Sequence, residues 1–184
     1  MSVIPQKEVP THNLRRAVIA NAVGTGTYTI GLGTVIQPGA TGHTKFVTTA
    51  AATNPILGVV IGIEYQNKIT ELSSVAGVNG ATTALAPGND NETNGYWKVV
   101  YIPSNVNVDY VADMSAALGT TTDSAGNVWF NLITLTTGAT GAATLDEASV
   151  ALFSGTQGQF FSFGADPAQP SNTKAVVCRV SKIL

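Results

Sequence analysis

Short apolar runs, separated by glycine, proline and asparagine, recur along the whole chain. The longest of these runs, residues 54–63, is rich in Ile and Val and contains Gly58 and Gly62 after Pro55. β-Branched residues favour a pleated and packed surface, and proline cannot donate a ladder hydrogen bond. We therefore expect a central strand entered at Pro55, with both glycines on one face. The two missing side chains would let another strand or a large aromatic ring approach closely.

Strand signals at such short spacing are typical of an all-β sandwich or barrel and not of βαβ units. We predict an all-β fold: a compact β-barrel or sandwich with an extended N-terminal arm and at most one short helix. The strands are expected at residues 15–22, 27–37, 44–50, 55–65, 68–73, 96–102, 127–136, 144–153, 157–164 and 174–184.

Residues 108–118 are the helical candidate. Tyr110, Met114 and Leu118 repeat every four residues there, and Gly119 follows at the position of a helix C-cap. The pattern allows at most three helical turns.

The N-terminal segment lacks any strand or helix periodicity. Residues 1–14 contain Pro5 and Pro10 and few large apolar residues, so we expect an extended arm before a β domain at residues 15–184. Fully stretched, such an arm spans up to about 40 Å, far enough to lie across a neighbouring subunit. The alternative for residues 1–14 is a disordered tail. The β domain could also be divided into two lobes, at residues 15–98 and 99–184.

Charged residues make up only 11% of the chain, against roughly 25% in an ordinary soluble protein. A monomer with so few charges would have a poorly solvated surface, which favours extensive contact with other subunits. The charges are also unevenly placed: residues 99–173 contain six acidic residues and no Lys or Arg, whereas both ends of the chain are basic. The basic ends favour contact with acidic surfaces, or are ordinary solvated charges. The acidic body argues against nucleic-acid binding.

Membrane insertion and secretion are not expected. No apolar run approaches the roughly 18 residues that a membrane-spanning helix needs. Arg15-Arg16 precedes a short apolar run that Asn21 interrupts, so we interpret it as the first strand and not as a leader. The acceptor pattern Asn91-Glu92-Thr93 lies in an expected polar surface loop and is interpreted as a chance match.

Patterns that would carry chemistry are weak. His12 and His43 lie far apart and no second cysteine is present, so we expect no metal site and no cofactor. No Gly-x-Ser-x-Gly pattern occurs, and we predict no catalytic residues and no enzyme activity. The single cysteine, Cys178, alternates with Val176 and Val180 and is expected to be a buried, inert thiol.

Three aromatic pairs or clusters indicate strands that are apolar on both faces. In Phe160-Phe161-Ser162-Phe163 the alternation of a strand places Phe160 opposite Phe161 and Phe163. Core packing explains one face, and a subunit contact explains the other. Tyr96-Trp97 and Trp129-Phe130 show the same pattern.

Residues 27–64 carry a resemblance to a known family. Their three segments, in order, are Gly33-Thr34-Val35-Ile36, Lys45-Phe46-Val47-Thr48-Thr49-Ala50 and Asn54-Pro55-Ile56-Leu57-Gly58-Val59. This order of strand, strand and Pro-Ile-Leu-Gly-Val resembles the capsid decoration, or cement, proteins of tailed bacteriophages. This chain is longer than the smallest of those proteins, and residues 99–173 would form the additional part.

The resemblance implies a virion structural protein, made in the host cytoplasm, that binds the capsid exterior. It would clamp neighbouring major capsid subunits against internal DNA pressure and associate with itself, as a trimer more than as a dimer. Under this hypothesis the arm residues that contact the capsid are Lys7, His12, Arg15 and Arg16. The residues that contact sibling subunits are Tyr96, Trp97 and Phe160.

Two other classes remain open from the sequence. One is another virion component: the base of a head fibre, a tail protein or a jelly-roll coat subunit. The other is a β-barrel carbohydrate-binding module or enzyme. Copy number in particles separates the first class from a decoration protein, and binding of a small ligand by the isolated protein identifies the second.

Overall fold

A computed structural model describes the backbone over most of the chain. The residues it describes are 3–20, 28–38, 46–50, 56–72, 74–77, 91–113, 131–137, 143–151, 160–172 and 174–180. Within them the fold is all-β, as predicted, and the longest helix is the single turn α1 (Asn91–Asn94). A 3-10 turn, η1 (Thr11–Asn13), precedes β2.

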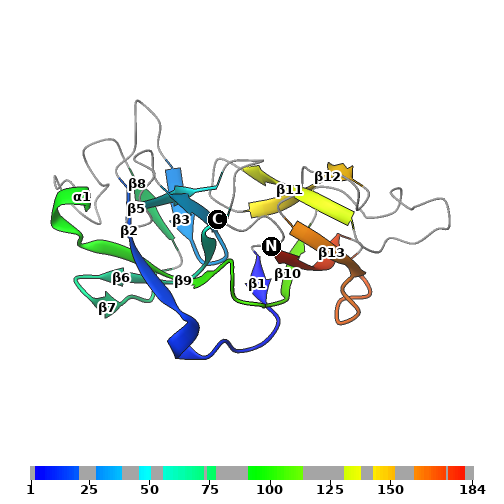
Figure 1. The fold of residues 1–184 in the computed structure, drawn as a ribbon, viewed down its shortest axis with the longest axis horizontal. Helices are drawn as coiled ribbons and strands as arrows, with labels where there is room; N and C mark the ends of the chain where they lie inside the picture. Colours follow the sequence, from blue (N-terminus) through cyan, green and yellow to red (C-terminus); the bar gives the residue numbers. More distant parts are fainter. Residues whose placement is uncertain are drawn as a thin grey trace.

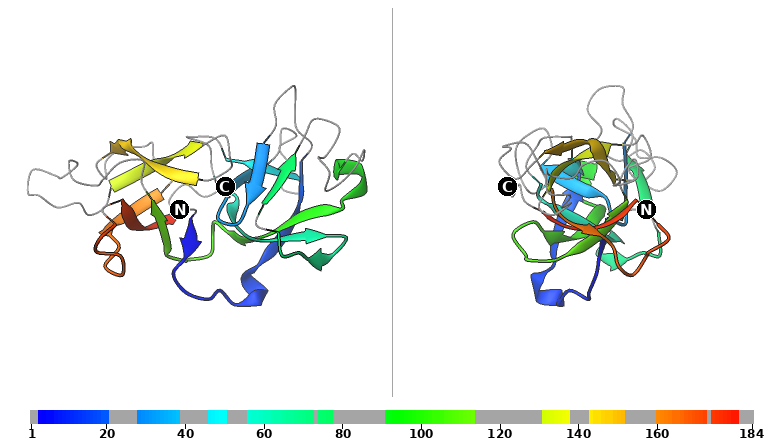
Figure 2. Two further views of the ribbon diagram at one scale, coloured as in Figure 1. Left: turned by 180° about the vertical axis from the view of Figure 1, so that it is seen from behind. Right: turned by 90° about the vertical axis from the view of Figure 1, so that its right-hand side faces the viewer.

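The described strands fall into a barrel-like sheet, a second large sheet and one separate pair. In chain order they are β1 (Ile4–Pro5), β2 (Arg15–Ile19), β3 (Tyr28–Gly31), β4 (Val35–Pro38), β5 (Phe46–Thr49), β6 (Gly58–Tyr65), β7 (Lys68–Ile69), β8 (Ser74–Gly77), β9 (Trp97–Pro103), β10 (Tyr110–Asp113), β11 (Asn131–Thr137), β12 (Ala143–Ala151), β13 (Phe160–Ala165) and β14 (Ala175–Val180). The barrel-like sheet and the second sheet lie side by side along the long axis of the molecule (Figures 1 and 2).

The barrel-like sheet has the strand order β4-β5-β2-β9-β6-β7. β4 also pairs with β6, which curls the sheet into a ring of pairings through β4, β5, β2, β9 and β6 and leaves β7 at its edge. Only β2 and β5 are parallel within this ring. The strand pair β3–β8 packs beside it (Figure 1).

The second sheet has the order β1-β10-β14-β13-β11-β12, and all its pairings are antiparallel. The chain passes from the barrel to this sheet after β9, between Pro103 and Tyr110. The N-terminal β1 also belongs to the second sheet, although the strands that follow it build the barrel.

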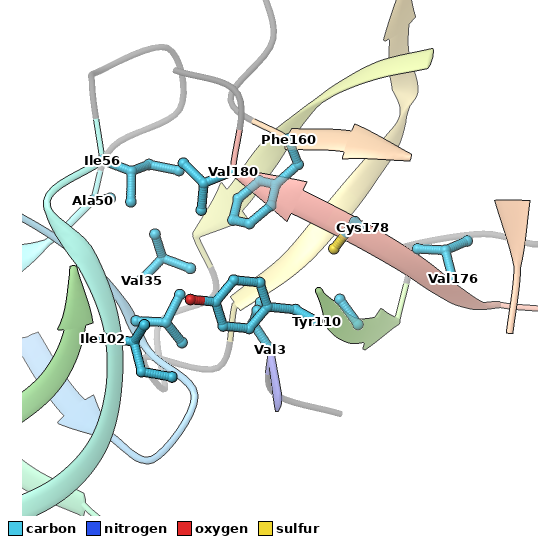
Figure 3. Packing of buried hydrophobic residues seen from close by; sticks show 12 residues of the cluster. Val3, Val35, Ala50, Ile56, Ile102, Tyr110, Phe160, Val176, Cys178 and Val180 are labelled. Carbon is cyan, nitrogen blue, oxygen red and sulfur yellow. The ribbon is translucent and has the colours of Figure 1, made fainter. Parts of the chain in front are cut away.

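Two apolar cores result from the alternation of side chains along each strand. In β9, Val99 and Tyr101 belong to the core inside the barrel, whereas Ile102 faces outward. We call the inner cluster the barrel core; it also includes Ala17, Ile19, Ile36, Val47, Val60, Ile63 and Trp97. The outward-facing residues of the barrel pack against the second sheet, and we call that cluster the interlobe core (Figure 3).

The interlobe core unites residues that are far apart in the sequence. The barrel contributes Val35, Ile56, Val59 and Ile102, and the second sheet contributes Tyr110, Ala112, Phe160, Val176, Cys178 and Val180. Figure 3 shows the ring of Tyr110 lying between Val3 and the barrel residues Val35 and Ile102. Each sheet therefore covers an apolar face of the other.

The central strand expected from the longest apolar run is present as β6. It pairs with β9 along one edge and with β4 and β7 along the other. Its pairing with β9 shifts by one residue between Val60 and Gly62. This bulge turns the strand, so that Val59 contributes to the interlobe core and Ile63 to the barrel core.

The two glycines of β6 have different roles. A Cβ on Gly58 would overlap the Ile102 carbonyl oxygen and the Tyr101 ring. The expected close approach of an aromatic ring is therefore confirmed at Gly58. A Cβ on Gly62 would lie 3.5 Å from the Cβ of Val100, an ordinary van der Waals contact, so the expectation is wrong there.

Two predicted elements need correction. The single strand expected at residues 27–37 is two strands, β3 and β4, because Gly33 adopts φ 77° and turns the chain between them. The helix expected at residues 108–118 is wrong where the structure describes it, because Tyr110 and Ala112 are buried in strand β10 and pair with β14. Large side chains recur there every four residues, as in a helix, but the buried residues of β10 recur every two residues, as in a strand. Residues 114–118 lie outside the described part of the chain.

The N-terminal segment is extended, but its described part lies on its own chain. Val3 is buried in the interlobe core, and Ile4 and Pro5 pair with Val111 and Tyr110 of β10. Residues 6–14 then run along the outside of the molecule from β1 to β2 (Figure 2). Val9 and Leu14 pack against the interlobe core along this course, so three apolar contacts fasten the segment to the body.

The two glycines of β6 form a matched pair for a stability test. We expect Gly58→Ala to lower the free energy of unfolding by about 3 kcal/mol, because the added methyl group must displace backbone and the Tyr101 ring. Gly62→Ala should change it by no more than about 0.5 kcal/mol. Urea denaturation of both variants measures the difference, and equal effects would contradict the packing described for Gly58.

Candidate interaction surface

The four predicted capsid-contact residues are all exposed. Lys7 and His12 lie on the segment that joins the two sheets along the outside, and Arg15 and Arg16 follow it at the start of β2. Pro10 directly precedes the turn η1, and its preset φ of −55° suits that entry. The turn brings the His12 carbonyl next to Arg15, whereas Arg16 lies on the other face of β2. The structure therefore separates the two adjacent arginines.

Arg15 has a guanidinium group fixed by the main chain. Its Nη1 atom donates hydrogen bonds of 3.0 Å to the carbonyl oxygens of His12 and Leu14. These two bonds use both hydrogens of Nη1 and leave the Nε and Nη2 donors.

A groove of about 430 Å³ has Arg15 in its lining. Leu57 and Tyr101, which belong to the barrel core, form part of its lining, so the groove opens at one end of the barrel. Asn13 and the turn at residues 103–106 complete it. Arg15 is the one charged residue in the described lining, and we call this hollow the Arg15 groove.

Tyr101 adds a hydroxyl group to the same groove. Arg15 and Tyr101 are direct partners in the antiparallel pairing of β2 with β9, so their side chains project from the same face of the sheet. Burial raises the pKa of the Tyr101 hydroxyl, and the positive charge of Arg15 opposes that change only in part. The hydroxyl therefore stays protonated at neutral pH and can donate a hydrogen bond.

Arg16 has a structural role instead. Its Nε donates to Oε1 of Glu64 at 2.7 Å, and the Glu64 side chain is only 2% exposed. Removing Arg16 would leave a buried carboxylate without this partner, which is strongly unfavourable. The sequence contains one signal for this ion pair: Glu64 directly follows the apolar run of β6, and a buried carboxylate needs a cation nearby. Arg16 is thus less available to an external partner than Arg15.

A second hollow of about 300 Å³ lies under the N-terminal segment. Its lining includes Lys7 together with the carboxylates of Glu8 and Asp109. Asp109 is paired with Arg179, whose Nε lies 2.7 Å from Oδ1 and whose guanidinium group covers the ring of Phe163. The mixed charges of this hollow give it no preference for an anion.

The predicted subunit-contact residues are corrected by their burial. Phe160 is fully buried in the interlobe core, and Trp97 is 3% exposed in the barrel core. Neither offers surface to a sibling subunit, because other strands of the same chain cover both side chains. Tyr96 is half-buried beside Tyr65, whose ring stacks against Trp97 with 4.5 Å between the centroids. Of the three residues, only Tyr96 reaches the surface.

Asn91 lies at the opposite end of the barrel from the Arg15 groove and is a structural residue that the sequence did not reveal. Its side chain is buried, donates to the carbonyl oxygens of Ile19 and Trp97 and accepts from the Trp97 N–H. The polar loop expected at the surface therefore has a buried, hydrogen-bonded side chain at Asn91. A buried amide is also unsuitable as a glycosylation acceptor.

Other kinds of site find little support in the part of the chain that the structure describes. No three His, Cys, Asp or Glu residues gather there in an arrangement that could hold a metal ion. Among the same residues, no helix is long and apolar enough to cross a membrane. Comparisons with protein-family models, with curated proteins and with solved structures give no match to this chain.

Asn91 provides a test of the closed end of the barrel. We expect Asn91→Ala to lower the free energy of unfolding by about 3 kcal/mol, because two carbonyl groups and one N–H lose a buried partner. Asn107→Ala, at an exposed position, is the control and should cost no more than about 0.5 kcal/mol. Thermal and urea denaturation give both values. A small effect at Asn91 would show that its bonds are replaced by water.

Cys178 provides a test of the interlobe core through pH. The thiol is fully buried, and burial, with a smaller effect from the charge of Asp109, raises its pKa above the ordinary 9.0. The unfolded chain therefore releases this proton at a lower pH than the folded protein, so stability falls as pH rises through 9. Between pH 8 and 9.5 we expect the wild type to lose about 0.8 kcal/mol more than Cys178→Ala.

Urea denaturation at the two pH values measures this difference. Iodoacetamide should also leave Cys178 unmodified at pH 8 until the protein unfolds. Rapid alkylation of the folded protein would contradict the burial of this thiol.

Proposed function

We propose that this chain is a virion structural protein, a capsid decoration protein of a tailed bacteriophage. It binds the outside of the assembled capsid and clamps neighbouring major capsid subunits. Its partners are the major capsid protein and copies of itself, arranged as a trimer, and it acts on no substrate, nucleic acid or membrane.

One observation carries this proposal: the three segments that resemble decoration proteins meet around a single strand. β4 pairs with β5 through Ile36 and Thr49, and with β6 through Val35 and Val59. The N–H of Ala50 also donates to the Val35 carbonyl at 2.8 Å, and the N–H of Leu57 donates to the Ile36 carbonyl at 2.8 Å. The resemblance therefore concerns one folded unit and not three unrelated matches. The apolar residues of these segments form part of the barrel wall.

The exposed basic segment supports a contact with an acidic shell. Lys7, His12 and Arg15 are exposed along a strip whose Val3, Val9 and Leu14 pack against the interlobe core, which lowers the conformational entropy that the strip loses when it docks. A protein that binds only the assembled shell stabilises it by mass action. Many copies on one lattice add avidity when each bridges more than one shell subunit.

The copy number in purified particles tests this function. We expect mass spectrometry of particles of the virus that encodes this chain to find on the order of hundreds of copies. Gentle stripping should remove the chain and lower the temperature at which the capsids release DNA, and adding the purified protein back should restore that temperature. A handful of copies would indicate a tail or fibre component, and absence from particles would refute a virion role.

A further inference from the structure

Arg15, which lines the groove, has an unused pair of donors in a geometry that matches a carboxylate. Because both hydrogens of Nη1 are bound to the carbonyls of His12 and Leu14, the guanidinium group is oriented before any ligand arrives. The remaining Nε and Nη2 donors point in parallel from one side of the planar group. Two parallel N–H donors are the arrangement that binds both oxygens of a carboxylate.

The lining around Arg15 supplies further polar groups and no competing negative charge. Tyr101 carries a protonated hydroxyl, and Asn13 and Asn105 carry side-chain amides that make no hydrogen bond within the described part of the chain. No Asp or Glu belongs to the described lining. The second hollow, in contrast, combines two carboxylates with Lys7 and has no preference for an anion.

Size and charge together select the ligand. A volume of about 430 Å³ lies in the range of roughly 300–1,000 Å³ that is typical of ligand pockets, and barrel ends are common places for them. One guanidinium group balances one carboxylate, whereas a phosphate dianion would remain half neutralised. The apolar surfaces of Leu57 and Tyr101 suit the methylene groups of an acidic side chain, and the amides suit the peptide backbone beside it.

We propose that the Arg15 groove binds an Asp or Glu side chain on an extended surface segment of the shell protein. This inference rests on the proposed function for the identity of the partner. The carboxylate accepts two hydrogen bonds from Nε and Nη2 of Arg15 and a third from the Tyr101 hydroxyl. The groove is therefore the specific part of the contact, and Lys7 and His12 contribute only general attraction.

The first experiment uses the isolated full-length protein, so it does not depend on the identity of the virus. The probe is N-acetyl-glutamate amide, and N-acetyl-glutamine amide is its neutral match. We expect the glutamate probe at millimolar concentration to shift the Arg15 Nε–H resonance in ¹H–¹⁵N spectra, and the glutamine probe to leave it unchanged. Inorganic phosphate is the third probe. No shift with the glutamate probe, or a stronger response to phosphate, would overturn the proposal.

The second experiment measures binding of variants to stripped capsids. Arg15→Gln should weaken binding at least tenfold, because it removes the charge and the two parallel donors. Arg15→Lys should also weaken it, because lysine keeps the charge but not the planar donors. Tyr101→Phe keeps the ring against Gly58 and removes only the hydroxyl, and it should weaken binding severalfold.

Lys68→Gln is the matched control for Arg15→Gln. Lys68 is exposed on β7 and lies outside both the Arg15 groove and the N-terminal segment, so removal of the same charge there should change binding less than twofold. Equal losses from Lys68→Gln and Arg15→Gln would refute a specific site. If the wild type binds no capsid, the proposed function fails, whereas the probe titration still decides whether the groove binds a carboxylate.

Discussion

The interlobe core is the contact on which the rest of this structure depends. The outward-facing Val59 and Ile102 of the barrel are buried only because the second sheet lies against them, and Tyr110 and Phe160 are buried only because the barrel does (Figure 3). Burial of apolar surface contributes roughly 25 cal/mol per Å², so separating the two sheets would greatly lower the stability of the fold. The same core receives Val3 and thereby fastens the N-terminal segment along the outside of both sheets.

This fastening explains why two adjacent arginines differ. Arg15 and Arg16 begin β2 and point to opposite faces, as alternation requires. Arg16 neutralises the buried Glu64, whereas Arg15 is held by carbonyl groups of the turn before it and lines a groove without carboxylates. A basic pair that looks uniform in the sequence is thus divided into a structural cation and a cation available to a partner.

Local patterns predicted much of the fold and less of the surface. The Ile- and Val-rich runs predicted the class and the central strand, because strand propensity and alternation are local properties. The prediction of subunit contacts was wrong for Trp97 and Phe160, because other strands of the same chain cover these two side chains. A sequence reports that a face is buried but not whether the cover is its own chain or another.

The sequence by itself determined the β class, the position of most strands, the basic N-terminal segment and the burial of Cys178. Only the tertiary structure decided which strands close the barrel, where Gly33 divides a strand and which arginine lines a groove. Those features depend on pairings between distant residues, such as Arg16 with Glu64, 48 positions apart. Loop closure and register decide such pairings, and neither leaves a periodic trace in the local sequence.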